Sequence, residues 1–440
     1  MTMAQTELTA PRSAQRASSN KRAAASSPPP AVKHHVQPAE RSRHSLTVRH
    51  LTSLAEISRE DWDRMFPGRV EGWDYFRACE SAVPPSFKPS ALVAFAGDVP
   101  VAAVPLFEIR YRLDMELPDG LRPVVALVGR VVPKLLRIPV LSIGSPLTEE
   151  CPIGFHPCLS PAERARAFAA LLEAMDRQSA QQGISMLALK DVADEHLPAI
   201  DDVMMQRGFT CVPTLPVATL HLPFAHEDEY LATLSANMRR DLRRKMQSAG
   251  KVTVEVCHSI DGIEDEIVEL FLETKAKSKV DYDGFDDVPA EYFRAVIASL
   301  GDKALIVLCR VDGVLAGFSL SLVEQNRVIG KYVGMRYPLA REHDVYFINW
   351  MTVVRYCIAH GITWLQTGQT TYKQKIRLGC QLKRSWVYFK HRGVLLGPVV
   401  RSVGKRLRFD LLDPDLSTEA DALPYLNPTA PSPAGQLPRA

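Results

Sequence analysis

The sequence predicts an α/β protein with two tandem copies of one unit, each a mixed, partly parallel central sheet flanked by helices. Three observations carry this prediction. A strand (328–335), a polar loop (338–344), a helix (346–360) and a second strand (362–367) follow one another, the order of a βαβ unit whose strands lie parallel. A similar arrangement occurs earlier in the chain. The 440 residues are also enough for two ordinary domains.

The repeat is visible in the turns and at the helix ends. Each half contains two strands around a Gly/Asp turn and, later, a helix that ends at a glycine followed by isoleucine and a strand. The matching positions are Gly97-Asp98 and Asp312-Gly313 for the turns, and Gly183-Ile184 and Gly361-Ile362 for the helix ends. Two copies of one unit explain the length of the chain. Chance similarity between two common α/β patterns is the alternative.

The elements of the first half are set by periodicity and by turn residues. Phe168, Leu171, Leu172 and Met175 recur at helical spacing. We expect helices at 62–66, 73–80, 161–182 and 197–207, and strands at 91–95, 99–109, 184–189 and 217–222. The segment 124–143 is apolar but interrupted by charges and prolines, whereas a membrane span needs about 20 largely uncharged residues. A folded insertion is the favoured interpretation, and a cationic loop on a membrane face is the alternative.

The second half begins with a linking helix, 227–249, that joins the two copies. We expect further helices at 263–279, 292–300 and 346–360, and strands at 252–256, 305–310, 314–323, 328–335, 362–367 and 385–390. A short basic turn occupies 371–379. The segment 394–409 is apolar and basic by turns, which suits either a helix packed on the second copy or an amphipathic helix lying on a membrane surface.

The two ends of the chain differ in composition from its middle. Residues 1–45 are rich in Ala, Ser, Pro and Arg, so we expect a disordered basic tail, although such a composition also imitates a transit peptide. The predicted division is a tail at 1–45, a first domain at 46–225, a second at 226–395, and an amphipathic basic segment with a Pro-rich tail at 396–440.

Composition excludes several classes of protein. The net charge of +3 gives no strong field for nucleic acid or membranes. Eight scattered cysteines without a CxxC pair favour reduced thiols over disulfides or a metal site. No apolar run opens the sequence, so we expect no Sec-type signal peptide and a cytoplasmic protein, with the inner face of the membrane as a further location. Catalytic-triad, zinc, Walker and dinucleotide signatures are missing, and we expect no metal.

Two stretches carry a family resemblance. One is 235–244, which holds Arg239, Arg240, Arg243 and Arg244, followed by 250–256; the other is 361–368, followed by Tyr372-Lys373 and Gly379. They resemble the GNAT superfamily of acyl-CoA transferases. More narrowly, they are similar to its Fem-type and cellulose-biosynthesis-type (CelD-like) branch, in which the GNAT fold occurs twice in one chain. The likeness covers about 46–392. It implies tandem GNAT-like domains and an active cleft in the second copy.

The resemblance implies acyl transfer from an acyl-CoA-type donor to an amine or hydroxyl. The acceptor would be a glycan, lipid or peptide of cell-envelope or polysaccharide metabolism. A Fem-like aminoacyl transferase that uses charged tRNA is the alternative enzyme. A non-catalytic binding protein is the third reading, because the loop 337–343 lacks the glycines with which common GNAT enzymes hold the donor pyrophosphate.

The candidate site residues follow from these expectations. Helix N-termini and basic side chains hold anions, strand glycines mark the approach of a ligand, and polar groups at a strand end orient an acceptor. The donor-binding candidates are Arg239, Arg243, Lys331, Tyr332, Gly334, Tyr346, Asn349, Lys373, Lys375 and Arg377. The catalytic candidates are Tyr372, Gln366 and Asp283. Solvated basic faces, core packing and a solvent-facing acidic loop are the plain alternatives for these residues.

Overall fold

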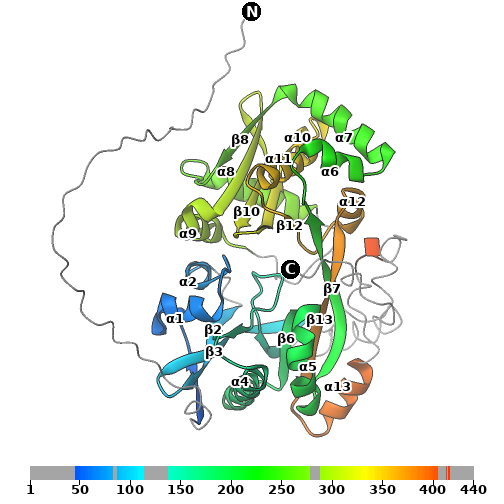
Figure 1. The fold of residues 1–440 in the computed structure, drawn as a ribbon. Coiled ribbons are helices and arrows are strands. Elements are labelled where there is room, and N and C mark those ends of the chain that lie inside the picture. The colour runs from blue at the N-terminus through cyan, green and yellow to red at the C-terminus, as the bar shows by residue number, and fades with distance from the viewer. Residues whose placement is uncertain are drawn as a thin grey trace, which may run out of the picture. The chain divides into compact units, whose positions relative to one another are not determined.

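A single mixed sheet organises the computed structural model, which describes residues 45–82, 87–112, 137–277, 288–404, 413 and 415–416 (Figure 1). The described strands follow the order β1-β2-β3-β4-β6-β13-β7-β12-β11-β10-β9-β8, and β5 pairs with β3. Their bounds are β1 Leu46–Leu51, β2 Lys88–Ala96, β3 Val99–Arg112, β4 Arg137–Ile143, β5 Gly154–Phe155, β6 Met186–Ala193, β7 Thr210–His221, β8 Val252–Cys257, β9 Ala304–Val311, β10 Val314–Val323, β11 Arg327–Met335, β12 Trp364–Gln366 and β13 Gln381–His391.

The sheet contains the predicted repeat. In each copy four consecutive strands pair antiparallel, β1 to β4 and β8 to β11. A helix then crosses over to a fifth strand that lies parallel to the fourth: α4 (Pro161–Gln181) leads to β6, and α11 (Val345–Ala359) leads to β12. The fold class predicted from the sequence is therefore confirmed, including the parallel pairing of β11 with β12.

The two copies are joined by an exchange of strands. β7 follows the first copy but pairs with β12 of the second, and β13 follows the second copy but lies between β6 and β7. Both strands run between the two copies in Figure 1. Because each copy borrows its neighbouring strand from the other, the described strands form one sheet. The domain boundaries at 45, 225 and 395 stay predictions.

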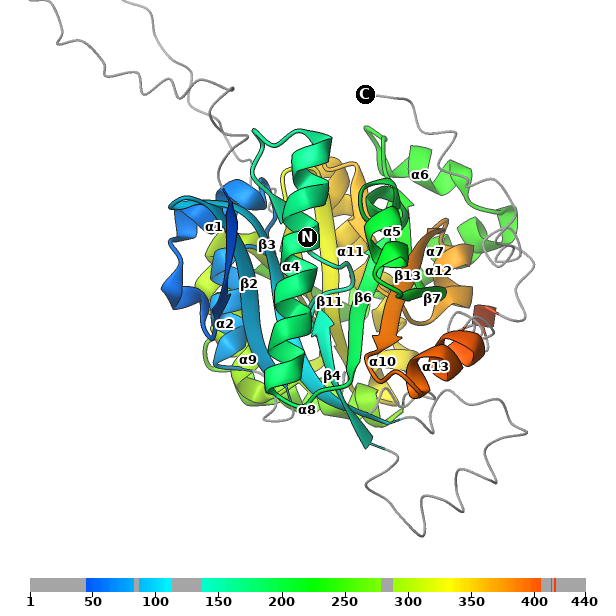
Figure 2. The same cartoon turned by 90° about the horizontal axis from the view of Figure 1, so that it is seen from below.

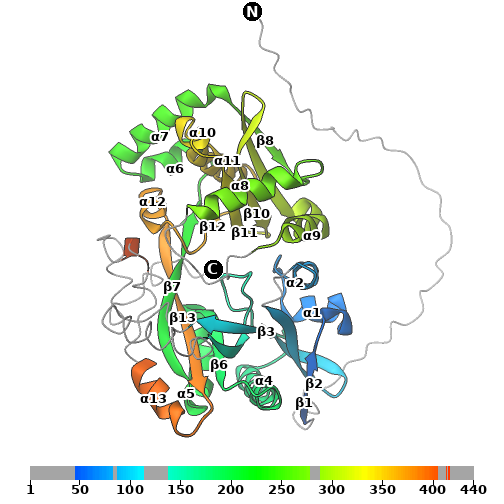
Figure 3. The same ribbon diagram turned by 180° about the vertical axis from the view of Figure 1, so that it is seen from behind.

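Helices cover both faces of this sheet. α4 and α5 (Leu197–Gln206) cover the first copy and lie in front of its strands in Figure 2, whereas α6 (Glu227–Thr233), α7 (Ala236–Ser248) and α11 pack on the second copy. In a different layer, α1 (Arg59–Met65), α2 (Trp73–Glu80), α8 (Glu264–Ala276) and α9 (Ala290–Leu300) enclose one core that both copies share (Figure 3). Tyr75 and Tyr292 meet there, with 3.0 Å between their hydroxyl oxygens.

Local sequence signals set several helix ends. Ser160 and Glu163 form a capping box at the start of α4, and glycines with positive φ follow both crossover helices, at Gly183 and Gly361. The linking helix expected at 227–249 is two helices instead. Leu234 is extended, and the Ser235 hydroxyl accepts a hydrogen bond from the Met238 N–H, which starts α7 anew.

Three further expectations need correction. The polar loop at 338–344 contains a short helix, α10 (Leu339–Glu342), and the basic turn is a helix, α12 (Tyr372–Arg377). Residues 137–143, expected within an insertion, form the core strand β4, because the neighbouring β3 and β6 satisfy its backbone despite Pro139. The rest of that segment lies outside the described residues.

The C-terminal amphipathic segment is partly described. It forms α13 (Leu396–Gly404), in which Gly404 lies against Phe389 of β13, while Val394 and Leu395 just before it are exposed. Within the described part of the chain, none of the helices combines the length and apolar character needed to cross a membrane.

Candidate active site

A cavity of about 870 Å³ opens where the parallel strands of the second copy separate. β11 and β12 pair only from Arg327 and Trp364 to Ile329 and Gln366. Beyond Ile329, β11 continues for six residues without β12 beside it. Gly330, Lys331 and Gln366 line the resulting gap. The splayed pair therefore provides the opening that the sequence predicted for a donor.

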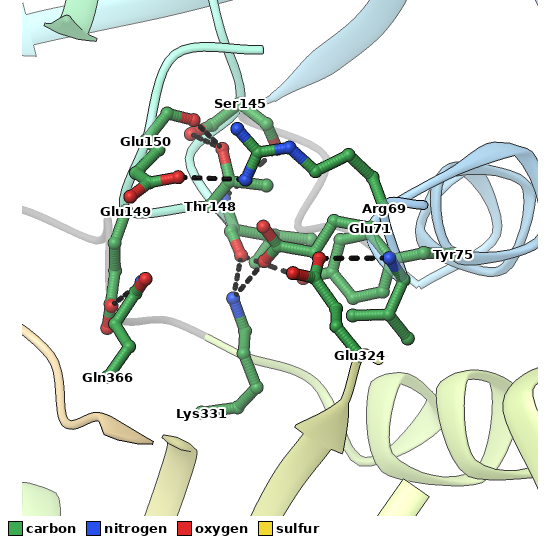
Figure 4. A network of polar contacts seen from close by, with 12 residues as sticks. Arg69, Glu71, Tyr75, Ser145, Thr148, Glu149, Glu150, Glu324, Lys331 and Gln366 are labelled. Carbon is green, nitrogen blue, oxygen red and sulfur yellow. Dashed lines mark hydrogen bonds and ion pairs between the residues drawn. The ribbon is translucent and has the colours of Figure 1, made fainter. Parts of the chain in front are cut away.

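A loop from the first copy enters this gap. β4 ends at Ile143, and the following loop, 144–151, carries Glu149 and Glu150 to the second copy (Figure 4). Gln366 Nε2 donates a hydrogen bond to Glu149 Oε2 at 2.8 Å. The site is thus built from both copies, which explains why a single GNAT-like unit of this chain could not form it.

Lys375 is the central cation of the cavity. It lies on the inner side of α12, while Lys373 and Arg377 on the same helix are exposed. Only 6% of Lys375 is exposed, and burial lowers the pKa of its amine to about 8, against the opposing attraction of Glu149. Within the described residues its ammonium makes no hydrogen bond or ion pair within 4.0 Å. It is therefore available to a ligand, and with a pKa of about 8 it is mostly charged at physiological pH, with a minor neutral fraction.

Gly368 brings Lys375 and Glu149 to the same place. A Cβ built at Gly368 would lie 2.8 Å from Glu149 Oε1 and 3.7 Å from Lys375 Nζ. Gly368 has φ of +85°, so glycine is favoured here on conformational grounds as well. Burial raises the pKa of the Glu149 carboxyl, although Lys331, Gln366 and Lys375 oppose that rise. The cavity therefore presents a buried amine with a lowered pKa and a buried carboxyl with a raised pKa side by side.

A buried ion network holds the loop in position. Arg327 Nη1 donates to Glu150 Oε2 at 3.0 Å and to Gln366 Oε1 at 3.0 Å, and its Nε donates to Glu324 at 2.9 Å. Arg69 donates to Glu150 from the other side, also at 3.0 Å. Burial alone would raise the pKa of Glu150, but Arg327 and Arg69 lower it to about 2. Arg327 thus connects the loop, β11 and the residue that orients Glu149.

Lys331 fixes the same loop at a second point. Its Nζ donates to Glu71 Oε1 at 2.7 Å and to the Leu147 carbonyl at 2.6 Å, and Tyr75 donates to that carbonyl at 2.7 Å (Figure 4). Burial lowers the pKa of Lys331, but Glu71 and Glu149 outweigh it, so the net shift is upward. Lys331 is therefore a charged, fully engaged group that shapes the wall.

Two exposed basic side chains, Lys277 at the end of α8 and Arg341 of α10, form a cationic mouth of the cavity. Their charged groups lie 5.2 and 5.0 Å from the centre of the Tyr337 ring. Asn349 and Ser319 also line the cavity, and the Asn349 Nδ2 and Ser319 Oγ atoms are buried without a hydrogen-bond partner among the described residues. Unsatisfied polar atoms on a cavity wall indicate a place for ligand or water.

The structure brings together some of the predicted site residues. Those that line the cavity are Lys331, Tyr332, Tyr346, Asn349, Gln366 and Lys375. Tyr372 is fully buried and donates to the Pro216 carbonyl at 2.8 Å. Gly334 lies against Phe318 and Leu270, where a side chain would collide. Asp283 lies outside the described residues, and its role stays a prediction.

The predicted basic groups outside the cavity have other surroundings. Arg239 donates to the carbonyl of Ala232 at 3.2 Å at the end of α6, and Arg243 lies 3.8 Å from Asp228 on the surface. Lys373 and Arg377 are exposed on α12. None of these four lines the cavity, so their assignment to donor binding stays a prediction.

Sequence reasoning missed Glu149, Glu150 and Arg327. A signal was present, because Ile143-Gly144 and Ile329-Gly330 occupy the same position in the two copies, at the last parallel pair. Polar residues that follow such a pair face the gap between the strands. The reach of the first loop into the second copy, however, depends on the strand exchange.

Comparison with known proteins assigns the family. The model of the FemAB-like family, described as peptidoglycan biosynthesis/recognition, matches residues 139–398. The chain belongs to the FemAB-like family. The match begins in β4 and ends in α13, so it contains the cavity residues named above but not Arg69, Glu71 and Tyr75, which support the loop. The cellulose-biosynthesis-type branch stays a prediction.

Several solved structures are similar to this FemAB-like protein. FemX superimposes with a TM-score of 0.52 at 11% identity, over 79% of this chain and 98% of FemX. The C-terminal domain of a putative lysylphosphatidylglycerol synthetase from Agrobacterium fabrum gives 0.48 at 12% identity, over 78% and 96%. A tandem GNAT protein from the clavulanic acid pathway gives 0.44 at 15%, over 79% and 99%. A search of curated proteins finds no match.

Proposed function

We propose that this FemAB-like protein is a transferase of the cell envelope that moves an acyl group from an acyl-CoA-type thioester to an amine. The observation that carries the proposal is Lys375, a buried amine without an ion-pair partner among the described residues, beside Glu149 at the point where β11 and β12 separate. A general base works best when its pKa lies near the operating pH, and the pKa of Lys375 is about 8.

The residues suggest a simple sequence of events. Lys277 and Arg341 attract the anionic part of the donor to the mouth, and the free edge of β11 offers backbone N–H groups to the thioester oxygen. Glu149 holds the acceptor as an ammonium ion. After that ion loses one proton to solvent, its nitrogen bonds to the carbonyl carbon.

The remaining proton passes through Lys375. As the new C–N bond forms, the neutral Lys375 amine accepts the second proton of the acceptor. The C–S bond then breaks, and the departing sulfur takes that proton from the Lys375 ammonium. Lys375 returns to its starting state, and the products are an amide and a free thiol. By family, we expect the acceptor to be an amine on a peptidoglycan-type peptide.

A thiol-release assay tests this proposal. The protein is mixed with acetyl-CoA or longer acyl-CoA and a peptidoglycan-derived peptide amine, and free CoA is measured. We expect release that depends on both substrates, abolished in Lys375→Met and retained in the surface variant Lys303→Met, because Lys303 is exposed and does not line the cavity. Equal activity in the two variants would refute the role of Lys375.

A tRNA-dependent aminoacyl transfer is the second candidate. It is favoured by the FemAB-like family and by the cationic mouth at Lys277 and Arg341, which suits the phosphates of a tRNA end as well as those of CoA. Transfer of a labelled amino acid from charged tRNA, with no release of CoA from acyl-CoA, would replace the first proposal with this one. If neither donor binds in a thermal-shift assay, the result would favour a non-catalytic binding protein over both transferases.

A further inference from the structure

The cavity has a second, apolar arm beneath the first copy. The strands β3, β4, β6 and β13 are neighbours, and one face of them is covered by α4 and α5. The side chains on the opposite face alternate along each strand and line the cavity. These side chains include Phe107, Ile109, Val140, Met186, Ala188 and Phe389.

The strand register makes these side chains one continuous surface. Ile109 lies opposite Val140, Val140 opposite Met186, and Ala188 opposite Phe389. From Phe107 to Tyr111 the surface is about 14 Å long, at about 3.4 Å per residue along a strand. The nearby charges, Lys190 and Asp191, form an ion pair with each other, so they add no net charge to the arm.

The arm continues directly from the reaction centre. Glu149 sits on the loop that leaves β4, and Thr214, Leu215 and Val387 line the cavity between the first-copy strands and β12. A molecule that spans the whole cavity therefore meets cations at Lys277 and Arg341, then the polar centre, then an apolar wall. That order of charge and polarity is the order within a fatty acyl thioester: anionic carrier, carbonyl carbon, aliphatic tail.

We infer that the first copy binds the aliphatic chain of the acyl donor, so that the transferred group is a medium- or long-chain fatty acyl group. This inference rests on the proposed function for the position of the carbonyl carbon. The inference also distinguishes acyl-CoA from aminoacyl-tRNA as the donor, because a small polar aminoacyl group would leave the apolar arm empty. The first copy would then select the acyl chain, while the second copy carries out the transfer.

The binding of acyl-CoA of increasing chain length tests the inference. Acetyl-, octanoyl-, dodecanoyl- and hexadecanoyl-CoA are titrated into the full-length protein by calorimetry. We expect affinity to rise about fourfold per methylene until the arm is filled, as for burial of apolar surface. Equal affinity for acetyl- and dodecanoyl-CoA would overturn the inference and leave the proposed function standing.

Two variants within the arm should shift the preferred chain length in opposite directions. Ala188→Phe narrows the arm and should shorten the preferred chain without changing acetyl-CoA binding. Ile109→Ala widens it and should lengthen the preferred chain. Val99→Phe, at the exposed start of β3, adds a phenylalanine at the surface and is the matched control. Unaltered chain preference in both arm variants would refute the assignment, and misfolding cannot produce shifts in opposite directions.

Binding of free dodecanoate tests the arm independently of the donor site. It carries the chain but no CoA, so its binding does not depend on the cationic mouth. Dodecanoate binding that Ala188→Phe weakens, without any binding of acyl-CoA, would support the arm and refute the CoA donor. Failure of dodecanoate to bind, together with binding of acetyl-CoA, would refute the arm alone.

Discussion

Replacing Lys375 by methionine should stabilise the protein at neutral pH while it removes the proposed activity. Methionine has a similar length and keeps the apolar contacts of the lysine stem, but it places no charge in the buried site. The folded protein holds Lys375 at 6% exposure, and burial is the largest cause of its lowered pKa. A functional group that destabilises its own fold is a common feature of active sites.

The magnitude follows from the pKa. The difference between the ordinary value of 10.5 and about 8 corresponds to about 3 kcal/mol, at about 1.36 kcal/mol per pKa unit. This difference already includes the favourable attraction of Glu149, so it is the net penalty of charging Lys375 in the folded state. We expect Lys375→Met to raise the free energy of unfolding by about 2–3 kcal/mol near pH 7.

The downward direction of the Lys375 pKa shift also determines how the stability difference depends on pH. Below about pH 8, Lys375 is charged in both the folded and the unfolded protein, so the full penalty is present. Between about pH 8 and pH 10.5 the folded protein loses the proton while the unfolded chain keeps it, and the penalty declines. The advantage of the variant should therefore disappear over that range.

Urea unfolding followed by tryptophan fluorescence measures this effect at several pH values. Taking the difference between variant and wild type cancels the titration of all other groups. Lys373→Met, on the exposed side of the same helix, should change stability by less than about 0.5 kcal/mol. The reasoning fails if Lys375→Met is no more stable than wild type near neutral pH, or if its advantage is the same at alkaline pH.

Three further predictions concern groups around the site. The transfer rate should rise with pH to a plateau above about 8, the pKa of Lys375. Glu149→Gln should move the midpoint of this pH–rate profile to lower pH, because it removes the negative charge that helps Lys375 to keep its proton. A midpoint that does not move would contradict this prediction. Arg327→Met leaves Glu150 buried without its main partner and should cost about 3–5 kcal/mol in thermal unfolding, which Glu150→Gln in the same chain should partly restore. Gly334→Ala would place a Cβ 2.8 Å from Phe318 Cδ1 and 2.9 Å from the Leu270 carbonyl carbon. We expect it to lower the free energy of unfolding by about 1–3 kcal/mol. Gly250→Ala places its Cβ in open space and should leave the stability almost unchanged in the same melting assay.

Much of the fold could be predicted because its signals are local. The helical spacing around Phe168, the glycines at Gly183 and Gly361 and the Gly/Asp turns each act within a few residues, and the structure has α4, α11 and both hairpins at those places. β4 was missed because Pro139 and its charged neighbours resemble a loop, while its stability comes from the strands on either side.

The site was only half predictable for a related reason. Lys331, Gln366 and Lys375 could be selected because each follows or lies within an element of one βαβ unit. The helix that starts at Tyr372 could not be told from a basic turn, yet it decides that Lys375 faces inward while Lys373 and Arg377 face out.

The sequence by itself determined the tandem α/β units, the parallel pair β11 and β12 and the place of the gap between them, since these depend on periodicity and on single glycines. Only the tertiary structure decided that β7 and β13 change places between the copies. That exchange brings Glu149 from one copy to Lys375 of the other, 226 residues apart in sequence, and buries both. Burial, which lowers one pKa and raises the other, is a property of the assembled sheet and of no local segment.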